Sequence, residues 1–341
     1  MHRSEITVDL GAVRRNVRTL VRALEGAELW AVVKADAYGH GAVDVAGAAL
    51  GSGASALCVA TVPEGLALRL EYPDARLLVL GPASSSREIA QARDAGLELA
   101  ISEPEIPEGL RVHLKLETGM HRYGLAELPG AVEHNVVGLM THLATADTDP
   151  AFARAQLDRF LAATSQHRDV TRHAANSAAA LRIPEARLDA ARCGIAIYGL
   201  SPFGADPADH GLEPALAWQS YVAQVKRLQP GESTGYGRRF VADEATWIGL
   251  VPIGYADGFR RDLTGTHVRV AGELRRVIGT ISMDSFAVEL DGELPVGSPV
   301  VLLGHGLLAE SHADVADTIN YEIVCGIDSD PRRARRTVID G

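Results

Sequence analysis

Apolar runs alternate with helical patterns over the first 215 residues of the chain. Ala-rich segments with helical periodicity separate the runs, a texture typical of βα units and a parallel sheet. The expected strands are residues 29–35, 56–61, 76–81, 97–102, 111–118, 136–144, 171–176 and 187–199. Eight parallel strands in succession favour a (β/α)8 barrel over an open doubly wound sheet, because no Gly-rich dinucleotide-binding turn follows the first strand.

Two of the connections are short for a parallel sheet. Only residues 103–110 join the fourth expected strand to the fifth, and residues 119–135 join the fifth to the sixth. A crossover that includes its helix normally needs roughly ten to twelve residues or more. We therefore expect single helical turns, or gaps in the outer ring of helices, at these two places.

Beyond about residue 216 the pattern changes to alternating apolar and polar positions with frequent turn signals. Strand patterns cover residues 221–228 and 246–254, and a hairpin is expected around residues 271–273. One helical stretch, residues 312–320, interrupts the pattern before the segment 321–327. The sequence therefore predicts two domains, a barrel over residues 1–215 and a mostly β domain over residues 216–341.

Composition and charge limit the possible partners. The chain has 341 residues, 47% of them apolar, and a net charge of −11, which disfavours nucleic acid and anionic membranes as partners. No apolar signal region or membrane-spanning run is present, so we expect a cytoplasmic protein that binds small molecules. The three cysteines at 58, 193 and 325 show no disulfide or metal-binding spacing.

Lys34 is the clearest candidate for chemistry. It ends an apolar run at residues 29–33 and is followed by a loop that contains Gly39 and Gly41. Barrel enzymes carry their catalytic groups at the carboxyl ends of the strands. A partly desolvated amine there has a lowered pKa, which favours Schiff-base formation or proton abstraction. The alternative is a lysine that extends its amine to solvent.

Seven motifs along the chain together resemble those of alanine racemases. The first is Val-Lys-Ala-Asp-Ala-Tyr-Gly-His-Gly at residues 33–41, similar to the family's cofactor-lysine motif. The others, in the family's order, occupy residues 115–122, 141–147, 173–177, 192–199, 254–258 and 282–284. The resemblance covers nearly the whole chain and both expected domains. It implies a pyridoxal-5′-phosphate (PLP) enzyme that works as a homodimer with shared active sites.

The resemblance assigns several barrel residues to the cofactor. Lys34 would carry PLP, and its phosphate would be bound by Tyr38, Ser177, Gly194 and Ile195. Arg192 would face the pyridine nitrogen, with His173 supporting the guanidinium. An arginine cannot accept the proton of that nitrogen, so the cofactor becomes a weaker electron sink. The resulting carbanion is then expected to be reprotonated before transamination competes.

Racemisation needs a proton removed from one face of the α-carbon and returned to the other. Lys34 would serve one face, and by resemblance Tyr255 of the other subunit would serve the second. His142 would hydrogen-bond the Tyr255 hydroxyl, since a phenol with a reference pKa near 10 needs such help.

The motifs at 115–122 and 282–284 would bind the substrate carboxylate of a small amino acid. Arg122 and the backbone N–H of Met283 would contact it, with Asp284 in the same loop. Lys115 would support Arg122, and the family often carries a carbamate on the lysine at this position.

The chain departs from the family near its C-terminus. Our alignment places Thr337 where the family has a tyrosine that narrows the pocket, and Thr280 where many relatives have arginine. A wider pocket would admit serine, although the basic residues 332–336 are equally compatible with a solvated tail. We expect interconversion of L- and D-alanine, supplying D-alanine for peptidoglycan. The alternatives are a serine or broad-specificity racemase, a decarboxylase on the same plan, and a non-catalytic PLP-binding protein.

Overall fold

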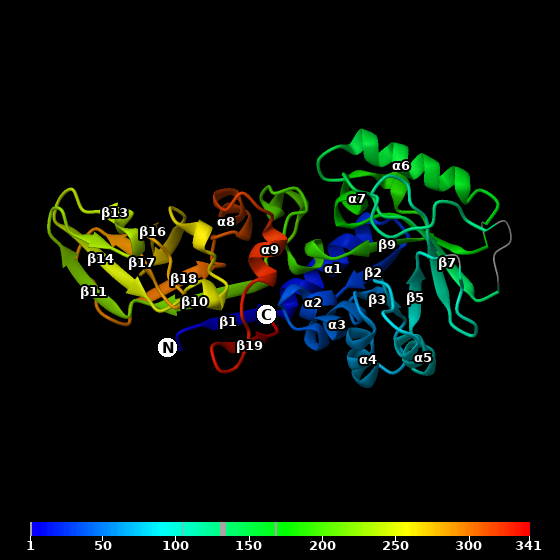
Figure 1. Ribbon diagram of the computed structural model, residues 1–341, viewed down its shortest axis with the longest axis horizontal. Helices are drawn as coiled ribbons and strands as arrows, with labels where there is room; N and C mark the ends of the chain where they lie inside the picture. The colour runs from blue at the N-terminus through cyan, green and yellow to red at the C-terminus, as the bar shows by residue number, and fades with distance from the viewer. Residues whose placement is uncertain (1, 104, 130–133, 168) are drawn as a thin grey trace. The chain divides into compact units, whose positions relative to one another are not determined.

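The structure, a computed structural model, describes residues 2–103, 105–129, 134–167 and 169–341 (Figure 1). It divides the chain into two compact units. The barrel unit comprises residues 13–203 and 208–213, and the β unit comprises residues 1–12, 204–207 and 214–341. No helix in the described part of the chain is long and apolar enough to cross a lipid bilayer.

Eight parallel strands form the barrel unit, as the sequence predicts. They are β2 Glu28–Val32, β3 Ala54–Val59, β4 Leu77–Val79, β5 Glu98–Ile101, β6 Val112–Lys115, β7 Val136–Met140, β8 Thr171–His173 and β9 Ala190–Cys193. Neighbours in the chain are neighbours in the sheet, and β9 returns to pair with β2. Backbone hydrogen bonds from Asp189 to Arg172 (3.1 Å) and from Arg192 to Ala175 (2.9 Å) close the barrel between β8 and β9.

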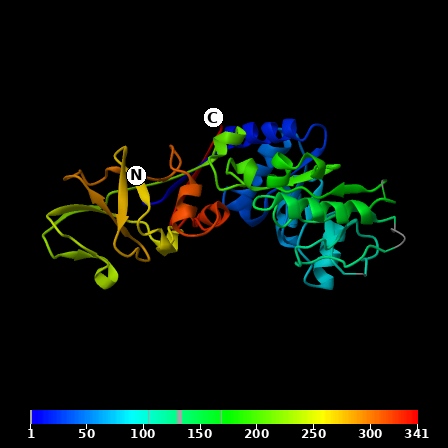
Figure 2. The same ribbon diagram turned by 90° about the horizontal axis from the view of Figure 1, so that it is seen from above.

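Helices lie outside these strands in both views (Figure 1 and Figure 2). They are α1 Leu10–Ala23, α3 Ala42–Leu50, α4 Val62–Glu71, α5 Ser86–Asp94, α6 Pro150–Ala163 and α7 Ser177–Arg182. The described residues between β5 and β6, and those between β6 and β7, contain no helix. Of the two expected alternatives, the described residues favour gaps in the outer ring over single helical turns.

The β unit is built on a nine-stranded sheet in the order β11-β14-β17-β16-β15-β18-β10-β1-β19. The strands are β1 Glu5–Asp9, β10 Leu216–Tyr221, β11 Gln224–Leu228, β14 Thr246–Val251, β15 His267–Val270, β16 Glu273–Ile278, β17 Phe286–Leu290, β18 Pro299–Leu303 and β19 Arg335–Ile339. All pairs are antiparallel except β1 with β19, which confirms a mostly β domain. A separate pair joins β12 Ser233–Thr234 to β13 Phe240–Val241.

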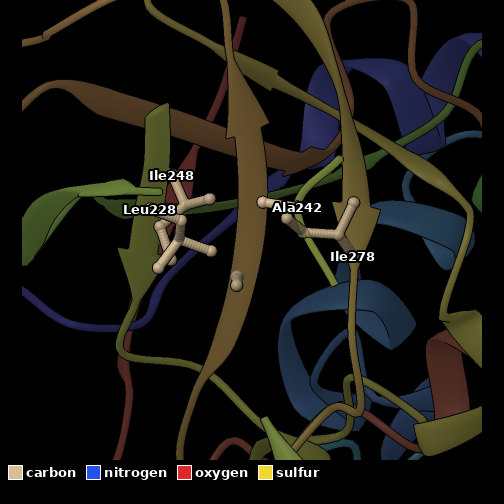
Figure 3. Close-up of a cluster of buried hydrophobic side chains, with 5 residues drawn as sticks. Leu228, Ala242, Ile248 and Ile278 are labelled. Carbon is tan, nitrogen blue, oxygen red and sulfur yellow. The ribbon is translucent and has the colours of Figure 1, made fainter. Parts of the chain in front are cut away.

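Apolar side chains pack within the β unit where the alternating pattern places them. The cluster of Leu228, Ala242, Ile248, Ile278 and Ala287 is buried (Figure 3). Phe240 and Leu250 are partly buried and pack against it. The expected hairpin is confirmed between β15 and β16, where Ala271 and Gly272 have φ values of 50° and 94°. Positive φ at both central residues is the geometry of a two-residue hairpin turn.

Two local expectations were wrong, and one of two open alternatives is excluded. Residues 221–228 are divided between β10 and β11, which pair with different neighbours. The expected helix at 312–320 is replaced by α8 Ala309–Val315, and α9 Asn320–Cys325 takes up most of the segment 321–327. Short apolar runs do not distinguish a buried strand from a buried helical turn. The basic residues 332–336 are not a solvated tail, because Arg335 and Arg336 belong to β19, which pairs with β1.

Candidate active site

Lys34 lies at the carboxyl end of β2, where it begins the short helical turn α2 Lys34–Tyr38. Ala35, Asp36, Ala37 and Tyr38 have φ values of 51°, 50°, 54° and 54°, so the turn is left-handed. This conformation costs roughly 1–2 kcal/mol per non-glycine residue. Surrounding contacts hold it: the Glu64 carboxylate accepts the Ala35 N–H (2.7 Å), and the Asp36 carboxylate accepts the Ala42 N–H (2.8 Å). Such stored strain commonly marks functional sites.

Hydroxyl and backbone donors converge near this turn, on the loops after β8 and β9. The Ser177 hydroxyl accepts hydrogen bonds from the N–H of Gly194 (3.0 Å) and of Ala196 (3.5 Å). The Tyr38 hydroxyl packs against Gly194 so closely that an added Cβ would lie 2.5 Å from it. Ile195 follows, fully buried. The structure thus brings together the four predicted phosphate-binding residues, and hydroxyls with backbone N–H groups suit a phosphate.

Arg192 is buried on β9, with 4% of its surface exposed. Its guanidinium donates to the carbonyl oxygens of Thr141 (2.8 Å) and His173 (2.9 Å), and to His173 Nδ1 (2.6 Å). Burial lowers the pKa of Arg192 to about 10, so it keeps its charge at neutral pH. The predicted pairing of Arg192 with His173 is therefore present in the barrel unit.

His142 is half-buried beside the same guanidinium, which donates to its Nδ1 at 3.4 Å. Burial first, and then the positive charge of Arg192, lower the pKa of His142 well below its ordinary value. The ring is therefore neutral, and since Nδ1 accepts, Nε2 carries the hydrogen. His142 can donate a hydrogen bond through Nε2.

Lys115 and Arg122 lie at the two ends of a tight loop after β6. The Lys115 amine donates to the Arg122 carbonyl at 3.2 Å, and the Glu117 carboxylate accepts N–H groups from Met120 (2.7 Å) and Arg122 (3.3 Å). Burial and the nearby Arg122 charge lower the pKa of Lys115 to about 8. The positive charges of Lys34, Lys115, Arg122 and Arg192 all act on His142. This concentration of cations attracts an anionic substrate.

Tyr255 and Met283 lie on two loops of the β unit that are bonded to each other. The N–H of Tyr255 donates to the Ser282 carbonyl (3.1 Å), and the N–H of Ala256 donates to the Met283 carbonyl (3.0 Å). Gly254 is required here, because an added Cβ would lie 2.3 Å from the Met283 oxygen. Tyr255 is 45% and Met283 53% exposed. Two predicted site residues thus sit on adjoining exposed loops.

Asp257 joins these loops to both ends of the chain, through residues that the sequence analysis missed. It is 1% exposed and accepts hydrogen bonds from Arg3 (2.7 and 2.9 Å), from Arg333 (3.0 Å) and from the Gly254 N–H (2.9 Å). Arg333 also donates to the predicted residue Asp284 at 2.7 Å. Arg333 therefore ties the Tyr255 loop to the Met283 loop.

The two departures from the family lie in the β unit. Thr337 is exposed on β19, opposite Thr7, and its effect on the pocket stays a prediction. Thr280 is buried, and its hydroxyl donates to the Tyr236 carbonyl at 2.7 Å. In the part of the chain that the structure describes, no group of three or more His, Cys, Asp or Glu side chains is arranged to hold a metal ion.

A strand-end lysine, a group of hydroxyl and backbone N–H donors and a buried arginine in a parallel barrel are typical of a barrel enzyme that acts on small anionic substrates. Family models agree over both units: "Alanine racemase, N-terminal domain" matches residues 8–202, and "Alanine racemase, C-terminal domain" matches residues 215–336. The chain belongs to the alanine racemase family, which comprises PLP-dependent isomerases.

Proteins named as alanine racemases match nearly the full length of the chain. The alanine racemase of Symbiobacterium thermophilum is 41% identical, covering 94% of this chain and 93% of that protein. The crystal structure of alanine racemase from Streptomyces lavendulae has a TM-score of 0.92 at 36% identity, covering 100% and 98%. That of Bacillus anthracis with bound L-Ala-P has a TM-score of 0.86 at 33% identity, covering 100% and 96%. These matches confirm the predicted family and leave the decarboxylase and the non-catalytic protein without support.

Proposed function

We propose that this protein racemises alanine by a two-base mechanism that uses PLP held at Lys34. The observation that carries the proposal is the position of Lys34 on a strained turn, beside the hydroxyl and N–H groups of Tyr38, Ser177 and Gly194. Those groups, with Ile195, would bind the phosphate. When bound, PLP supplies an electron sink for the α-carbon of the amino acid.

Arg192 would face the pyridine nitrogen and limit that sink. Its guanidinium only donates hydrogen bonds and keeps its proton at neutral pH, so it would leave the pyridine nitrogen unprotonated. PLP would then withdraw less electron density from the α-carbon, and return of a proton to that carbon would be favoured. This favours racemisation over side reactions.

The second base in this proposal is Tyr255 from the partner subunit of a homodimer. Tyr255 and Met283 are large side chains, 45% and 53% exposed, on adjoining loops, and a partner surface would cover them. His142 would donate through Nε2 to the Tyr255 oxygen and stabilise its phenolate. The barrel over residues 1–215 would then bind the cofactor, while the domain over residues 216–341 would complete the neighbour's site.

The substrate in this proposal is a small amino acid, alanine first. Arg122 and the Met283 N–H would bind its carboxylate, with Lys115 supporting Arg122. Asp284 would act through Arg333, which its carboxylate already binds. The product D-alanine would serve peptidoglycan synthesis. Serine is the second candidate substrate, on the strength of Thr337 alone.

Chiral product analysis tests the proposal. The purified protein with added PLP should convert L-alanine and D-alanine to the same mixture, because enantiomers have equal free energies. In D₂O the α-hydrogen of both enantiomers should exchange for deuterium. L-serine and L-arginine, assayed alongside, define the specificity. Turnover of alanine without the opposite enantiomer, or with release of CO₂, would rule the racemase assignment out.

Lys115 is expected to take up CO₂ as a carbamate. At pH 8 about half of its amine is unprotonated, given a pKa of about 8, and only that form reacts with CO₂. The protonated Lys115 amine repels the Arg122 guanidinium, whereas the negatively charged carbamate would attract it. With ¹³C-bicarbonate, the NMR spectrum should show a carbamate signal that is lost in Lys115→Ala and declines as the pH falls below 8. A signal that persists in Lys115→Ala would place the carbamate elsewhere.

Arg333→Ala is expected to lower kcat/KM by about tenfold to a hundredfold, because the Tyr255 and Met283 loops lose their common anchor. The melting temperature should fall as well, since the buried Asp257 loses one of its two arginines. Arg332→Ala is the matched control, as Arg332 is 87% exposed and pairs with Asp330. Equal effects of the two substitutions on kcat/KM would show that Arg333 does not act through the loops.

A further inference from the structure

A chain of four side chains runs through the interior of the barrel unit, from Arg192 to Glu98. Arg192 donates to His173 Nδ1 (2.6 Å), His173 Nε2 lies 2.8 Å from His113 Nδ1, and His113 Nε2 lies 2.8 Å from the Glu98 carboxylate. The residues belong to β9, β8, β6 and β5. At most 4% of each is exposed. The sequence analysis identified the first two residues and missed His113 and Glu98.

A glycine on the strand between the two histidines makes their contact possible. Gly138 lies on β7, and a Cβ added there would be 1.9 Å from His113 Nδ1. Any side chain at this position would displace the imidazole that reaches His173. Trp30 packs against both imidazoles: its ring centroid lies 4.5 Å from that of His173 and 5.6 Å from that of His113. The four side chains are therefore buried in the interior of the barrel unit, where hydrogen bonds are strengthened.

The residues at the two ends of this hydrogen-bonded series, Arg192 and Glu98, fix the direction of every hydrogen bond in it. A guanidinium only donates, so His173 Nδ1 accepts and the neutral ring carries its hydrogen on Nε2. That hydrogen is donated to His113 Nδ1, and His113 Nε2 then donates to Glu98, since a carboxylate only accepts. Burial lowers the pKa of both histidines, in keeping with neutral rings. A single tautomer of each imidazole satisfies the whole chain.

Glu98 provides a permanent negative charge at the far end. It also accepts hydrogen bonds from Arg76 (2.9 Å) and pairs with Arg111 (2.9 Å). Burial by itself would raise the pKa of Glu98, but the hydrogen bond from His113 and the hydrogen bond and charge of Arg76 hold it below its ordinary value. A buried cation and a buried anion thus face each other through two neutral imidazoles.

We propose that Glu98 and His113 are positioning residues for Arg192: through the two imidazoles, the carboxylate polarises His173 Nδ1 and holds the guanidinium in one orientation. This inference rests on the proposed function for its catalytic consequence, because that function places Arg192 at the pyridine nitrogen. Loss of the hydrogen bonds that join Arg192 to Glu98 should free the Arg192 guanidinium to reorient. Racemisation should then slow and transamination should increase, while substrate binding, which depends on other residues, should be retained.

The first test examines tautomers in the cofactor-free protein, so it does not depend on racemase activity. In ¹⁵N NMR of histidine-labelled protein, His113 and His173 should each show a protonated Nε2 and an unprotonated Nδ1. Glu98→Gln should preserve this pattern, because its amide oxygen can still accept from His113. Glu98→Leu should disturb the signals of both rings. A protonated Nδ1 on His173 in the unmodified protein would overturn the proposal.

The second test measures the ratio of transamination to racemisation in the PLP-loaded enzyme. Glu98→Leu and Gly138→Ala should each lower kcat by about tenfold, leave KM for alanine within about twofold, and raise that ratio by about tenfold. Glu98→Gln should restore most of the loss. Arg111→Ala is the matched control, because Arg111 also binds the Glu98 carboxylate but is 63% exposed and forms no part of the connection from Glu98 to Arg192.

Gly138→Ala removes none of the four polar side chains but displaces the His113 imidazole, so it tests the proposal independently if Glu98→Leu does not fold. An unchanged ratio in Gly138→Ala, with His173 tautomers unaltered, would overturn the proposal. Absence of racemase activity in the unmodified protein would instead refute the proposed function, and the NMR result would still decide whether the chain orders Arg192.

Discussion

Lys34→Ala is expected to lower alanine racemisation by at least about 10⁴-fold, because it removes both a base and the covalent attachment of the cofactor. The unmodified protein should be yellow with PLP, and borohydride reduction should fix a pyridoxyl group on the peptide that contains Lys34. The variant should lose this adduct. Chiral chromatography of the products and mass spectrometry of the peptides provide the two measurements.

The composition of the chain makes this test unusually clean. It contains three lysines, Lys34, Lys115 and Lys226, so only three peptides can carry the adduct. Lys226 is exposed on β11 of the β unit, and Lys226→Ala should leave both the adduct and the rate unchanged. A pyridoxyl group on Lys115 or Lys226 of the unmodified protein would refute the assignment of Lys34.

The barrel was predictable because each of its strands leaves a local signal. Strands buried on both faces appear as apolar runs, as in residues 54–59, and polar residues such as Lys34 mark the strand ends. β1 leaves no comparable signal for its place in the β unit, since its partners β10 and β19 lie about two hundred and more residues away. Pairing over such distances is decided by tertiary structure.

The left-handed turn after Lys34 was also beyond sequence reasoning. Only Gly39 and Gly41 indicated unusual backbone, whereas the four residues before them have side chains that disfavour positive φ. Hydrogen bonds from outside the turn, above all to Glu64 on α4, impose its shape. Such an override of local preference is typical of functional sites.

The missed residues of the barrel interior left a signal that could be recognised. His113 lies two positions before Lys115 on the same strand, so the two side chains share one face of the sheet. Glu98 stands in an otherwise apolar strand, and a buried carboxylate needs partners. Their identity depends on contacts across β7, which no periodic pattern encodes. Arg333 was missed for a similar reason, because no local pattern distinguishes it from the neighbouring arginines at 332, 335 and 336.

Tyr255→Phe is expected to slow racemisation by about 10²–10⁴-fold, since it removes the proposed second base. Exchange of the substrate α-hydrogen with D₂O should persist from the one enantiomer that Lys34 serves, which separates loss of a base from loss of fold. Tyr236→Phe is the matched control, because Tyr236 is a 73% exposed tyrosine of the same unit. Equal losses in both variants would indicate a general effect on the β unit.

Mixing the Lys34→Ala and Tyr255→Phe proteins decides whether the two bases come from different subunits. If Tyr255 acts in the partner's site, a mixed dimer has one site with both bases and one with neither. Random exchange at equal concentrations makes half of the dimers mixed, so about one quarter of all sites should regain full activity. If each site is built within one chain, every site lacks one base and no activity returns. Native mass spectrometry should confirm the exchange, and the recovered rate, compared with one quarter of the unmodified rate, then distinguishes the two arrangements.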